Sequence, residues 1–212
     1  MIYYSIESLA RAGIFEFLIT TTSRHQQAFI DSLTNARFSN LHFTFAIQDS
    51  TNGIAESLSI GKEFIGDDDV CLVTGDTIIL GEELDAQVIK AIRSARKSAN
   101  ATIFISNLYD SEQYVVIIYE NSGSNIKIGG KAPSYYYSIT GFYVFPNRVV
   151  NKINTIVPSE CRLLEIITLH KLFHNDKKLQ NQELNNKCKW FTPNNFKELL
   201  DASIYFSKIK NY

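Results

Sequence analysis

An aspartate at the end of an apolar run is the residue of this 212-residue sequence best placed for chemistry. The segment VCLVTGD, residues 70–76, ends in Asp76. A continuous apolar run is typical of a strand buried on both faces of a parallel sheet. Ligands of open α/β sheets bind beyond the carboxyl ends of such strands, where a carboxylate can hold a hard cation against phosphate oxygens. From this pattern alone, a turn or helix-capping role for Asp76 is an equally good interpretation.

A second candidate is the segment QDSTNGIAESL, residues 48–58, in which Gly53 precedes a helical pattern. A glycine-containing loop that opens a helix presents backbone N–H groups to an anion or to the edge of a base. An ordinary helix N-terminus explains the same residues, and taken alone this simpler interpretation is favoured.

Composition disfavours several classes of function. The formal net charge is -1, which gives no reason to expect a nucleic acid or an anionic membrane as partner. No apolar run approaches the ~20 residues that span a bilayer, and the start of the chain does not have the pattern of a signal peptide. The cysteines are widely spaced without a C-x-x-C motif, so a cytoplasmic location is expected. His170 and His174 have helical i, i+4 spacing, for which a surface pair is favoured over a metal site.

The elements that must position these residues alternate along the first half of the chain. Helices are expected at 6–12, 25–33, 54–64 and 82–97, and strands at 14–20, 43–47, 70–74 and 102–106. This order predicts right-handed βαβ units and a mostly parallel sheet. Antiparallel strands are expected at 114–120, 126–128 and 136–145, followed by helices at 163–173 and 196–206 that flank a polar loop. No linker is evident, so we expect one α/β domain, residues 1–212, with a mixed sheet.

Six segments in order carry a resemblance that covers nearly the whole chain. They are MIYYSIESLARAGIFEFLITTT (1–22), QDSTNGIAESLSIGKEFIGDDDVCLVTGDTIILGEEL (48–84), DSEQY (110–114), YYSITGFYVF (136–145), RLLEIITLHKLF (162–173) and KWFTPNNFKELLDAS (189–203). With these segments the chain resembles the glucose-1-phosphate thymidylyltransferases, which are sugar-phosphate nucleotidyltransferases. The resemblance implies a Rossmann-like, three-layer α/β nucleotidyltransferase fold.

The resemblance also implies roles for individual residues. Gln48 and Gly53 would read the pyrimidine edge, Asp76 would bind Mg²⁺, and Tyr114 and Lys131 would lie near the sugar phosphate. In the family's reaction a sugar 1-phosphate oxygen attacks the α-phosphate of a nucleoside triphosphate and pyrophosphate leaves, a step of deoxysugar or surface-polysaccharide synthesis. The implied ligand is dTTP or a dTDP-sugar, and the implied partner is a second copy or a full-length homologue.

The chain departs from the family pattern at residues that carry the reaction. Met1 falls after the family's first strand, its glycine-rich triphosphate loop and a phosphate-clamping lysine. Thr192 stands where the pattern has a second Mg²⁺-binding aspartate, and Gly130 where it has a glutamate near the sugar. Because preorganised phosphate-binding groups supply most of the catalysis in such reactions, we expect an impaired or inactive enzyme. The alternative is a non-catalytic remnant of the family that binds a nucleotide or a partner protein.

A fold that lacks the family's first strand would have two unpaired strand edges inside its sheet. Three outcomes are open at this point. The sheet closes up differently, another chain supplies the missing strand, or residues upstream of Met1 supply it.

Overall fold

The structure, a computed structural model, describes residues 1–34, 36–49, 52–81, 83–107, 115–120, 123–128, 136–156, 166–193 and 195–208. The helices are α1 (Ile2–Arg11), α2 (Ser23–Leu33), α3 (Glu56–Ile60), α4 (Lys62–Ile65), α5 (Leu84–Ser98), α6 (Val149–Ile153), α7 (Ile166–Asn175) and α8 (Phe196–Lys208), with a 3-10 turn at Ala36–Phe38. The strands are β1 (Glu16–Thr21), β2 (His42–Ile47), β3 (Val70–Val73), β4 (Ile78–Leu80), β5 (Ala101–Asn107), β6 (Val115–Glu120), β7 (Gly123–Ile128), β8 (Tyr136–Phe145), β9 (Leu179–Glu183) and β10 (Lys189–Phe191). None of the described helices is long and apolar enough to cross a bilayer.

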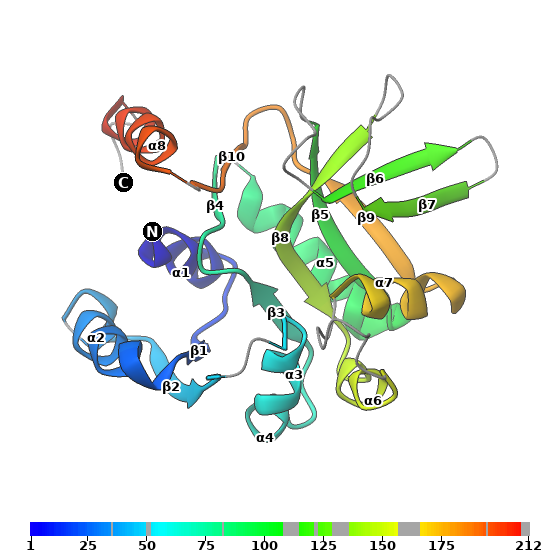
Figure 1. The fold of residues 1–212 in the computed structure, drawn as a ribbon, viewed down its shortest axis with the longest axis horizontal. Helices are drawn as coiled ribbons and strands as arrows, with labels where there is room; N and C mark the ends of the chain where they lie inside the picture. Colours follow the sequence, from blue (N-terminus) through cyan, green and yellow to red (C-terminus); the bar gives the residue numbers. More distant parts are fainter. Residues whose placement is uncertain are drawn as a thin grey trace.

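The main sheet is organised around the long strand β8 (Figure 1). Strand β5 pairs with one edge of β8, while β6 and then β3 pair with its other edge. All three are antiparallel to β8, and β9 is parallel to β5, so β3, β5, β6 and β9 share one direction. The expected mixed sheet is therefore confirmed. Most neighbouring pairs are nevertheless antiparallel, because β8 runs the opposite way among strands of common direction.

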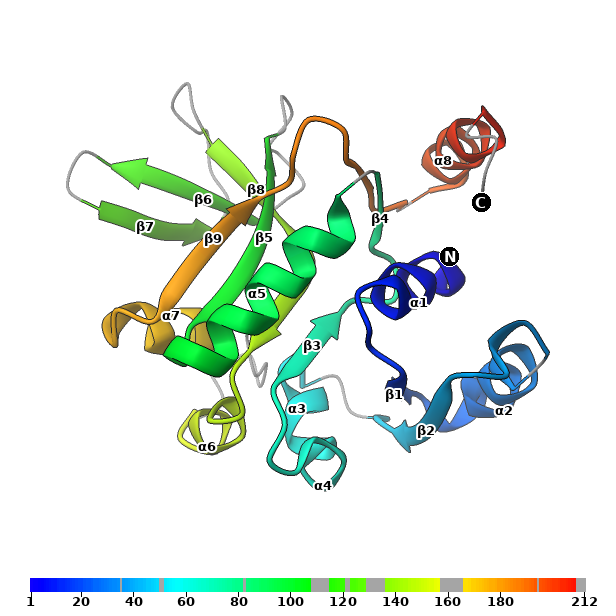
Figure 2. The same cartoon turned by 180° about the vertical axis from the view of Figure 1, so that it is seen from behind.

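Strands β1 and β2 form a separate parallel pair, joined by α2 as the sequence predicts. Strands β4 and β10 form a second small sheet, which is antiparallel. Among the described residues, β1 pairs with β2 alone and β3 pairs with β8 alone. The sheet has therefore not closed up between β1 and β3, and Figure 2 shows the two strands as separate ribbons.

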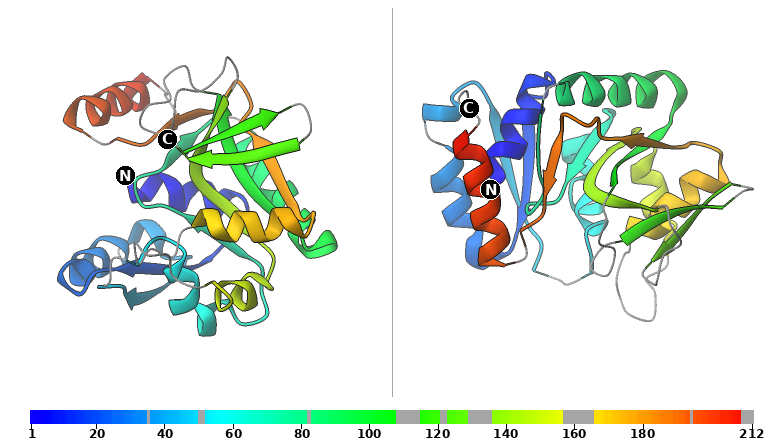
Figure 3. Two further views of the ribbon diagram at one scale, coloured as in Figure 1. Left: turned by 45° about the vertical axis from the view of Figure 1, so that its right-hand side comes forward. Right: turned by 90° about the horizontal axis from the view of Figure 1, so that it is seen from above.

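Helices pack against both faces of the main sheet, which gives the expected three layers (Figure 3). On one face Val88 of α5 packs with Phe142, in the same cluster as residues of α1. On the other face Phe173 of α7 packs with Phe145, in the same cluster as residues of α3 and α6. Because successive side chains of a strand point to opposite faces, Phe142 and Phe145 reach different layers, and β8 is buried along nearly its whole length.

The segment expected as a polar loop after α7 contains two strands. Strand β9 has the sequence LQNQE, yet it pairs in parallel with β5 over all five residues. One of its polar side chains bonds to a neighbouring helix, since Ser94 on α5 donates to Oε1 of Gln180 (2.8 Å). Strand β9 lies at the edge of the sheet, where polar side chains are common. The alternation of apolar and polar residues that indicates a strand is therefore absent from its sequence.

Candidate nucleotide site

Gln48 directly follows β2, and its side chain is fixed by two hydrogen bonds. Its Nε2 donates to the carbonyl oxygen of Gly53 (3.0 Å) and to Oε2 of Glu56 (2.9 Å). Both partners are acceptors, so the orientation of the amide is determined. Among the residues that the structure describes, no donor bonds to Oε1 of Gln48. This oxygen is therefore the acceptor that Gln48 can offer to a ligand N–H.

The loop from β2 to α3 is closed by the same network. Asn52 Nδ2 donates to Oε1 of Glu56 (2.7 Å), so one carboxylate accepts from side chains at both ends of the loop. Gly53 has a φ of +92°, a conformation that glycine adopts without the steric cost of a Cβ. The two residues predicted to read a base, Gln48 and Gly53, are thus in direct contact.

Asp76 lies in a tight turn that follows β3. The N–H of Thr77 donates to the carbonyl oxygen of Thr74 (3.0 Å), which makes residues 74–77 a β-turn. The Thr77 hydroxyl donates to the carbonyl oxygen of Thr140 on β8 (2.6 Å), and Ser5 of α1 donates to the carbonyl oxygen of Thr77 (2.6 Å). The turn is held from two sides while Asp76 itself is exposed. Since β4 follows the turn, a helix-capping role for Asp76 is excluded.

Gly141 lies directly beneath this turn. The N–H of Thr74 donates to its carbonyl oxygen (3.0 Å), and its φ is +81°. A Cβ at this position would lie 2.5 Å from Oγ1 of Thr77 and closer still to Oγ1 of Thr74. The β5–β8 register also shifts at this point, as it does at a β-bulge. Glycine at 141 is therefore what lets β8 approach the Asp76 turn so closely.

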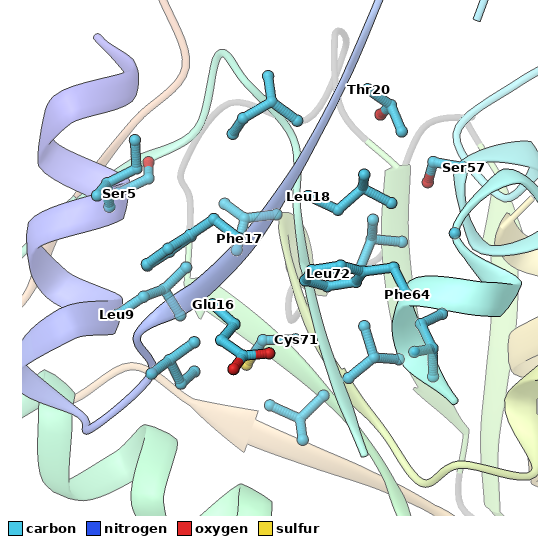
Figure 4. A pocket seen from close by; sticks show the side chains of 18 of the residues that line it. Ser5, Leu9, Glu16, Phe17, Leu18, Thr20, Ser57, Phe64, Cys71 and Leu72 are labelled. Carbon is cyan, nitrogen blue, oxygen red and sulfur yellow. The ribbon is translucent and has the colours of Figure 1, made fainter. Parts of the chain in front are cut away.

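Both segments border one cavity of about 820 Å³. Gln48, Thr74 and Gly75 line it where β2 and β3 end. The cavity continues between β1 and β3, where Leu18 and Leu72 line it (Figure 4). Its volume is within the range of small-molecule sites, about 300–1,000 Å³, and a site at strand carboxyl ends is where open α/β sheets bind ligands.

A buried tyrosine and a half-buried cysteine next to this region have displaced pKa values. Burial, and to a lesser degree the negative charge of Asp76, raise the pKa of the Tyr143 hydroxyl above its ordinary value. The surrounding protein atoms raise the pKa of the Cys71 thiol to about 12. Both groups are therefore neutral at neutral pH. Cys71 therefore contributes an uncharged surface to the cavity.

Comparison with known proteins identifies the fold and the family. A family model described as nucleotidyl transferase matches residues 1–207. The chain belongs to the nucleotidyl transferase family. A glucose-1-phosphate thymidylyltransferase of Neisseria meningitidis serogroup A is 30% identical over 213 residues, covering 100% of this chain and 73% of the relative. The enzyme of that name from Mycolicibacterium smegmatis is 26% identical over 212 residues, covering 99% of this chain and 72% of the relative. The resemblance inferred from the sequence is thereby confirmed.

Solved structures share the fold of this nucleotidyl transferase. A Bacillus anthracis protein named as a glucose-1-phosphate thymidylyltransferase, solved in complex with sucrose, has a TM-score of 0.84 at 23% identity, covering 98% of this chain and 82% of its own. A UDP-glucose pyrophosphorylase complexed with UDP-glucose has a TM-score of 0.81 at 14% identity, covering 98% and 86%. The expected Rossmann-like α/β nucleotidyltransferase fold is therefore confirmed.

The predicted metal position of this nucleotidyl transferase has one carboxylate. Among the described residues, no three His, Cys, Asp or Glu side chains gather into a metal-binding group. Thr192 directly follows β10, and Phe191 pairs with Ile78 of β4. Continuing that register puts Thr192 opposite Thr77, one residue from Asp76. A carboxylate and a hydroxyl fit a Mg²⁺ ion that is held mainly by substrate phosphates, which is how proteins often bind this cation.

The other predicted residues have different outcomes. Tyr114, Lys131 and Gly130 lie outside the described residues, so their roles near a sugar phosphate stay predictions. The expectation of a surface histidine pair is wrong for His170, which is 0% exposed and packs against Tyr143, with ring centroids 5.2 Å apart. Burial lowers the pKa of His170 to about 3, so this histidine is a neutral member of the core.

Four residues that shape the site were not singled out from the sequence: Glu56, Thr74, Thr77 and Gly141. A lone glycine inside the apolar strand YYSITGFYVF is a recognisable sign of a bulge or a close backbone approach. The threonines and Glu56 give no such sign, because their contacts include ones to residues 8 to 67 positions away in the chain.

Proposed function

We propose that this chain binds a pyrimidine nucleotide, dTTP or the corresponding nucleotide sugar, where β2 and β3 end. The observation that carries the proposal is the fixed amide of Gln48, whose donor side is committed to Gly53 and Glu56. Gln48 borders the cavity together with Thr74 and Gly75, the two residues before Asp76. A nucleotide would then have its base at the β2 end and its phosphates at the β3 end.

The chemistry of the base follows from the available groups. Thymine and uracil present an N–H between two carbonyl oxygens, whereas cytosine presents an amino donor and a bare ring nitrogen. Oε1 of Gln48 can accept from the ring N–H, and the backbone N–H of Gly53 can donate to a neighbouring carbonyl oxygen. Cytosine would leave Oε1 opposite a ring nitrogen that carries no proton. The site is therefore proposed to favour thymine or uracil.

At the phosphate end, Asp76 would hold Mg²⁺ together with the substrate phosphates, and Mg²⁺ would neutralise phosphate charge. The proposed reaction class is the family's transfer, in which a sugar 1-phosphate oxygen bonds to the α-phosphorus while the bond to pyrophosphate breaks. Thr192, with a hydroxyl in place of a second carboxylate, supports a weakened catalyst. It also supports the second candidate, a non-catalytic protein that binds the nucleotide without turning it over.

The same proposal includes three further points. Residues 1–212 form a single domain, the protein is cytoplasmic, and it associates with a second copy or with a full-length homologue. The curated relatives are longer than this chain, which covers 73% of the Neisseria meningitidis protein.

Calorimetric titration of the purified chain with dTTP and dTDP-glucose in Mg²⁺ tests the binding site. Gln48→Leu should weaken binding about tenfold or more, because it removes the acceptor and opens the loop. Gln27→Leu is the matched control, since Gln27 donates to Asp31 on the exposed surface of α2 (2.8 Å). Binding of dCTP as tight as that of dTTP, or equal loss in both variants, would contradict the assignment of Gln48.

Pyrophosphate release from dTTP and glucose 1-phosphate separates the two candidates. A slow release that Asp76→Ala abolishes would establish a catalyst and exclude the purely binding protein. Nucleotide binding without any release would support the binding protein instead. Asp67→Ala, an exposed carboxylate in the turn before β3, is the control for a general change in surface charge.

A further inference from the structure

Glu56 can affect which base Gln48 accepts without touching the base itself. Its Oε2 accepts from Nε2 of Gln48 (2.9 Å), and its Oε1 accepts from Nδ2 of Asn52 (2.7 Å). Both oxygens of the carboxylate therefore bond to side chains of the loop between β2 and α3. The amide of Gln48 has a donor end and an acceptor end, so the partner that holds one end decides which end a ligand meets.

The backbone of Gln48 is fixed by bonds that do not involve Glu56. The N–H of Gln48 donates to the carbonyl oxygen of Thr21 at the end of β1 (2.8 Å). The next residue, Asp49, accepts through Oδ1 from the N–H of Ser23 at the start of α2 (2.7 Å). A change at Glu56 would thus leave Gln48 at its place after β2, and only the orientation of its side-chain amide would respond.

Glu56 itself is held in place by α3. It is the first residue of this helix, and its N–H donates to the carbonyl oxygen of Gly53 (3.2 Å). Ala55 and Leu58, on either side of it in the chain, are buried in the core. The half-buried Glu56 therefore presents its carboxylate to Gln48 from a fixed backbone.

Turning the Gln48 amide over would exchange its nitrogen and its oxygen. Oε1 would then take the place of Nε2, opposite the carbonyl oxygen of Gly53 and Oε2 of Glu56. A carbonyl and a carboxylate have no proton to donate, so two hydrogen bonds would be replaced by two contacts between acceptors. Both partners thus favour the observed orientation of the amide.

Of the two partners, the carboxylate has the larger effect. A hydrogen bond to an ionised group is roughly twice as strong as one between neutral groups. Gly53 contributes a backbone carbonyl, which any residue at that position would contribute, whereas Glu56 contributes its side chain. Position 56 is therefore where the choice of amino acid sets the orientation of the Gln48 amide.

The orientation of the amide decides between two kinds of base edge. Thymine and uracil present a ring N–H that Oε1 of Gln48 can accept, whereas cytosine presents a bare ring nitrogen that requires a donor. The turned amide would present Nε2 and would suit cytosine. A residue that holds the amide in one orientation therefore adds specificity, because the wrong base meets a group with which it cannot pair.

We propose that Glu56 is a positioning residue that sets the preference for thymine or uracil over cytosine, acting through the amide of Gln48. The role rests on the proposed nucleotide site, since the orientation of the amide matters only if a base meets Gln48. The selectivity of the site would then depend on a side chain that does not contact the nucleotide.

Calorimetric titrations with dTTP and with dCTP, both in Mg²⁺, test the proposal as a ratio of two affinities. Glu56→Gln keeps the size of the side chain but gives it a donor, so the Gln48 amide can turn over and accept from it through Oε1. The preference for dTTP over dCTP should fall at least about tenfold. A purely structural role would weaken both nucleotides by the same factor and leave the ratio unchanged.

Two control variants isolate the bond between Glu56 and Gln48. Asn52→Ala removes the other bond of the same carboxylate and should weaken dTTP and dCTP equally, which leaves their ratio unchanged. Glu63→Gln neutralises an exposed carboxylate on α4 and should change neither affinity. A fall of the ratio in either control as large as in Glu56→Gln would overturn the proposal.

The unliganded wild-type protein provides a second measurement, which does not depend on a variant. Nε2 of Gln48 donates to two acceptors in the loop, whereas Gln27 donates to Asp31 (2.8 Å) from the exposed surface of α2. The side-chain amide protons of Gln48 should exchange with water at least about tenfold more slowly than those of Gln27. Equal exchange in the two residues would show that the amide is not held, and the proposal would fail even if Glu56→Gln did not fold.

The titrations also distinguish a failure of this proposal from a failure of the proposed function. A wild-type protein that prefers dTTP, with the full preference retained in Glu56→Gln, would refute the role of Glu56 and leave the nucleotide site standing. A wild-type protein that binds neither nucleotide would refute the nucleotide site and the role of Glu56 with it.

Discussion

Replacing Gly141 with alanine tests how the Asp76 turn is built. Gly141→Ala adds a Cβ within 2.5 Å of Oγ1 of Thr77, in a backbone of φ +81°. The left-handed conformation costs an alanine about 1–2 kcal/mol, and overpacking costs about 1–3 kcal/mol more. The sum is a loss of about 2–5 kcal/mol in the free energy of unfolding.

Gly13→Ala separates the two costs. Gly13 has a φ of +87°, yet a Cβ there would meet no atom within 4 Å. Only the conformational cost of about 1–2 kcal/mol applies to it. Urea unfolding followed by the fluorescence of Trp190, the one tryptophan of the chain, measures both variants.

Equal losses in Gly141→Ala and Gly13→Ala would refute the reasoning, because the close approach of β8 to the two threonines would then contribute nothing. The crowding also predicts an effect on function. Relief of the contact must move the Thr74 or Thr77 hydroxyl, so Gly141→Ala should weaken nucleotide binding in Mg²⁺ at temperatures where the variant is folded. Gly13→Ala should leave that affinity unchanged.

Two further predictions concern the core. His170 is neutral in the folded chain with a pKa of about 3, so its contribution to stability is complete above its unfolded pKa of about 6.5 and is lost as pH falls from there toward 3. At about 1.4 kcal/mol per pH unit this loss reaches about 2 kcal/mol at pH 5, and urea unfolding of His170→Phe at pH 7 and pH 5 should show that part of the pH dependence removed. Phe104→Ala should cost about 3–5 kcal/mol, since Phe104 is 0% exposed and packs edge-to-face on Phe142, with ring centroids 4.9 Å apart. Phe196→Ala, at a side chain 91% exposed, should change unfolding little; a similar cost in both variants would contradict the assigned core.

The sequence predicts those parts of the fold that have a local signal. The apolar runs of β3, β5 and β8 indicate strands because β5 and β8 are mostly buried and β3 is half-buried between the helical layers. The direction of β8 and its position between β3, β5 and β6 have no local signal in the sequence. The position of a strand in a sheet depends on contacts with residues distant in the chain. Strand β9 was missed for the same reason, because its pairing with β5 compensates for a sequence of weak strand propensity.

The residues of the candidate site also differ in whether the sequence gives a local signal for them. Asp76 and Gly53 could be proposed from a strand end and a loop glycine, and the structure puts Gln48 in contact with Gly53. The groups that hold them could not be proposed, because Thr77 bonds to Thr140 and Ser5 bonds to Thr77 across 63 and 72 residues. For His170 the sequence pattern led to a wrong prediction. The i, i+4 spacing of His170 and His174 suggested a surface pair, but His170 lies on the buried face of α7.

The hydroxyls of α1 also bear on the order in which the chain can fold during synthesis. Ser5 and Ser8 bond to carbonyl oxygens 72 and 71 residues later, so α1 emerges from the ribosome well before its anchors exist. At about 5–20 residues per second, this delay is about 4–14 seconds. Strand β4, which carries the second of those carbonyls, waits longer for β10, whose residues follow more than a hundred positions later. During that interval α1 can pack only on segments made soon after it, as Tyr3 does on Phe38, so the side of α1 that later faces β4 is a surface that a chaperone would meet exposed.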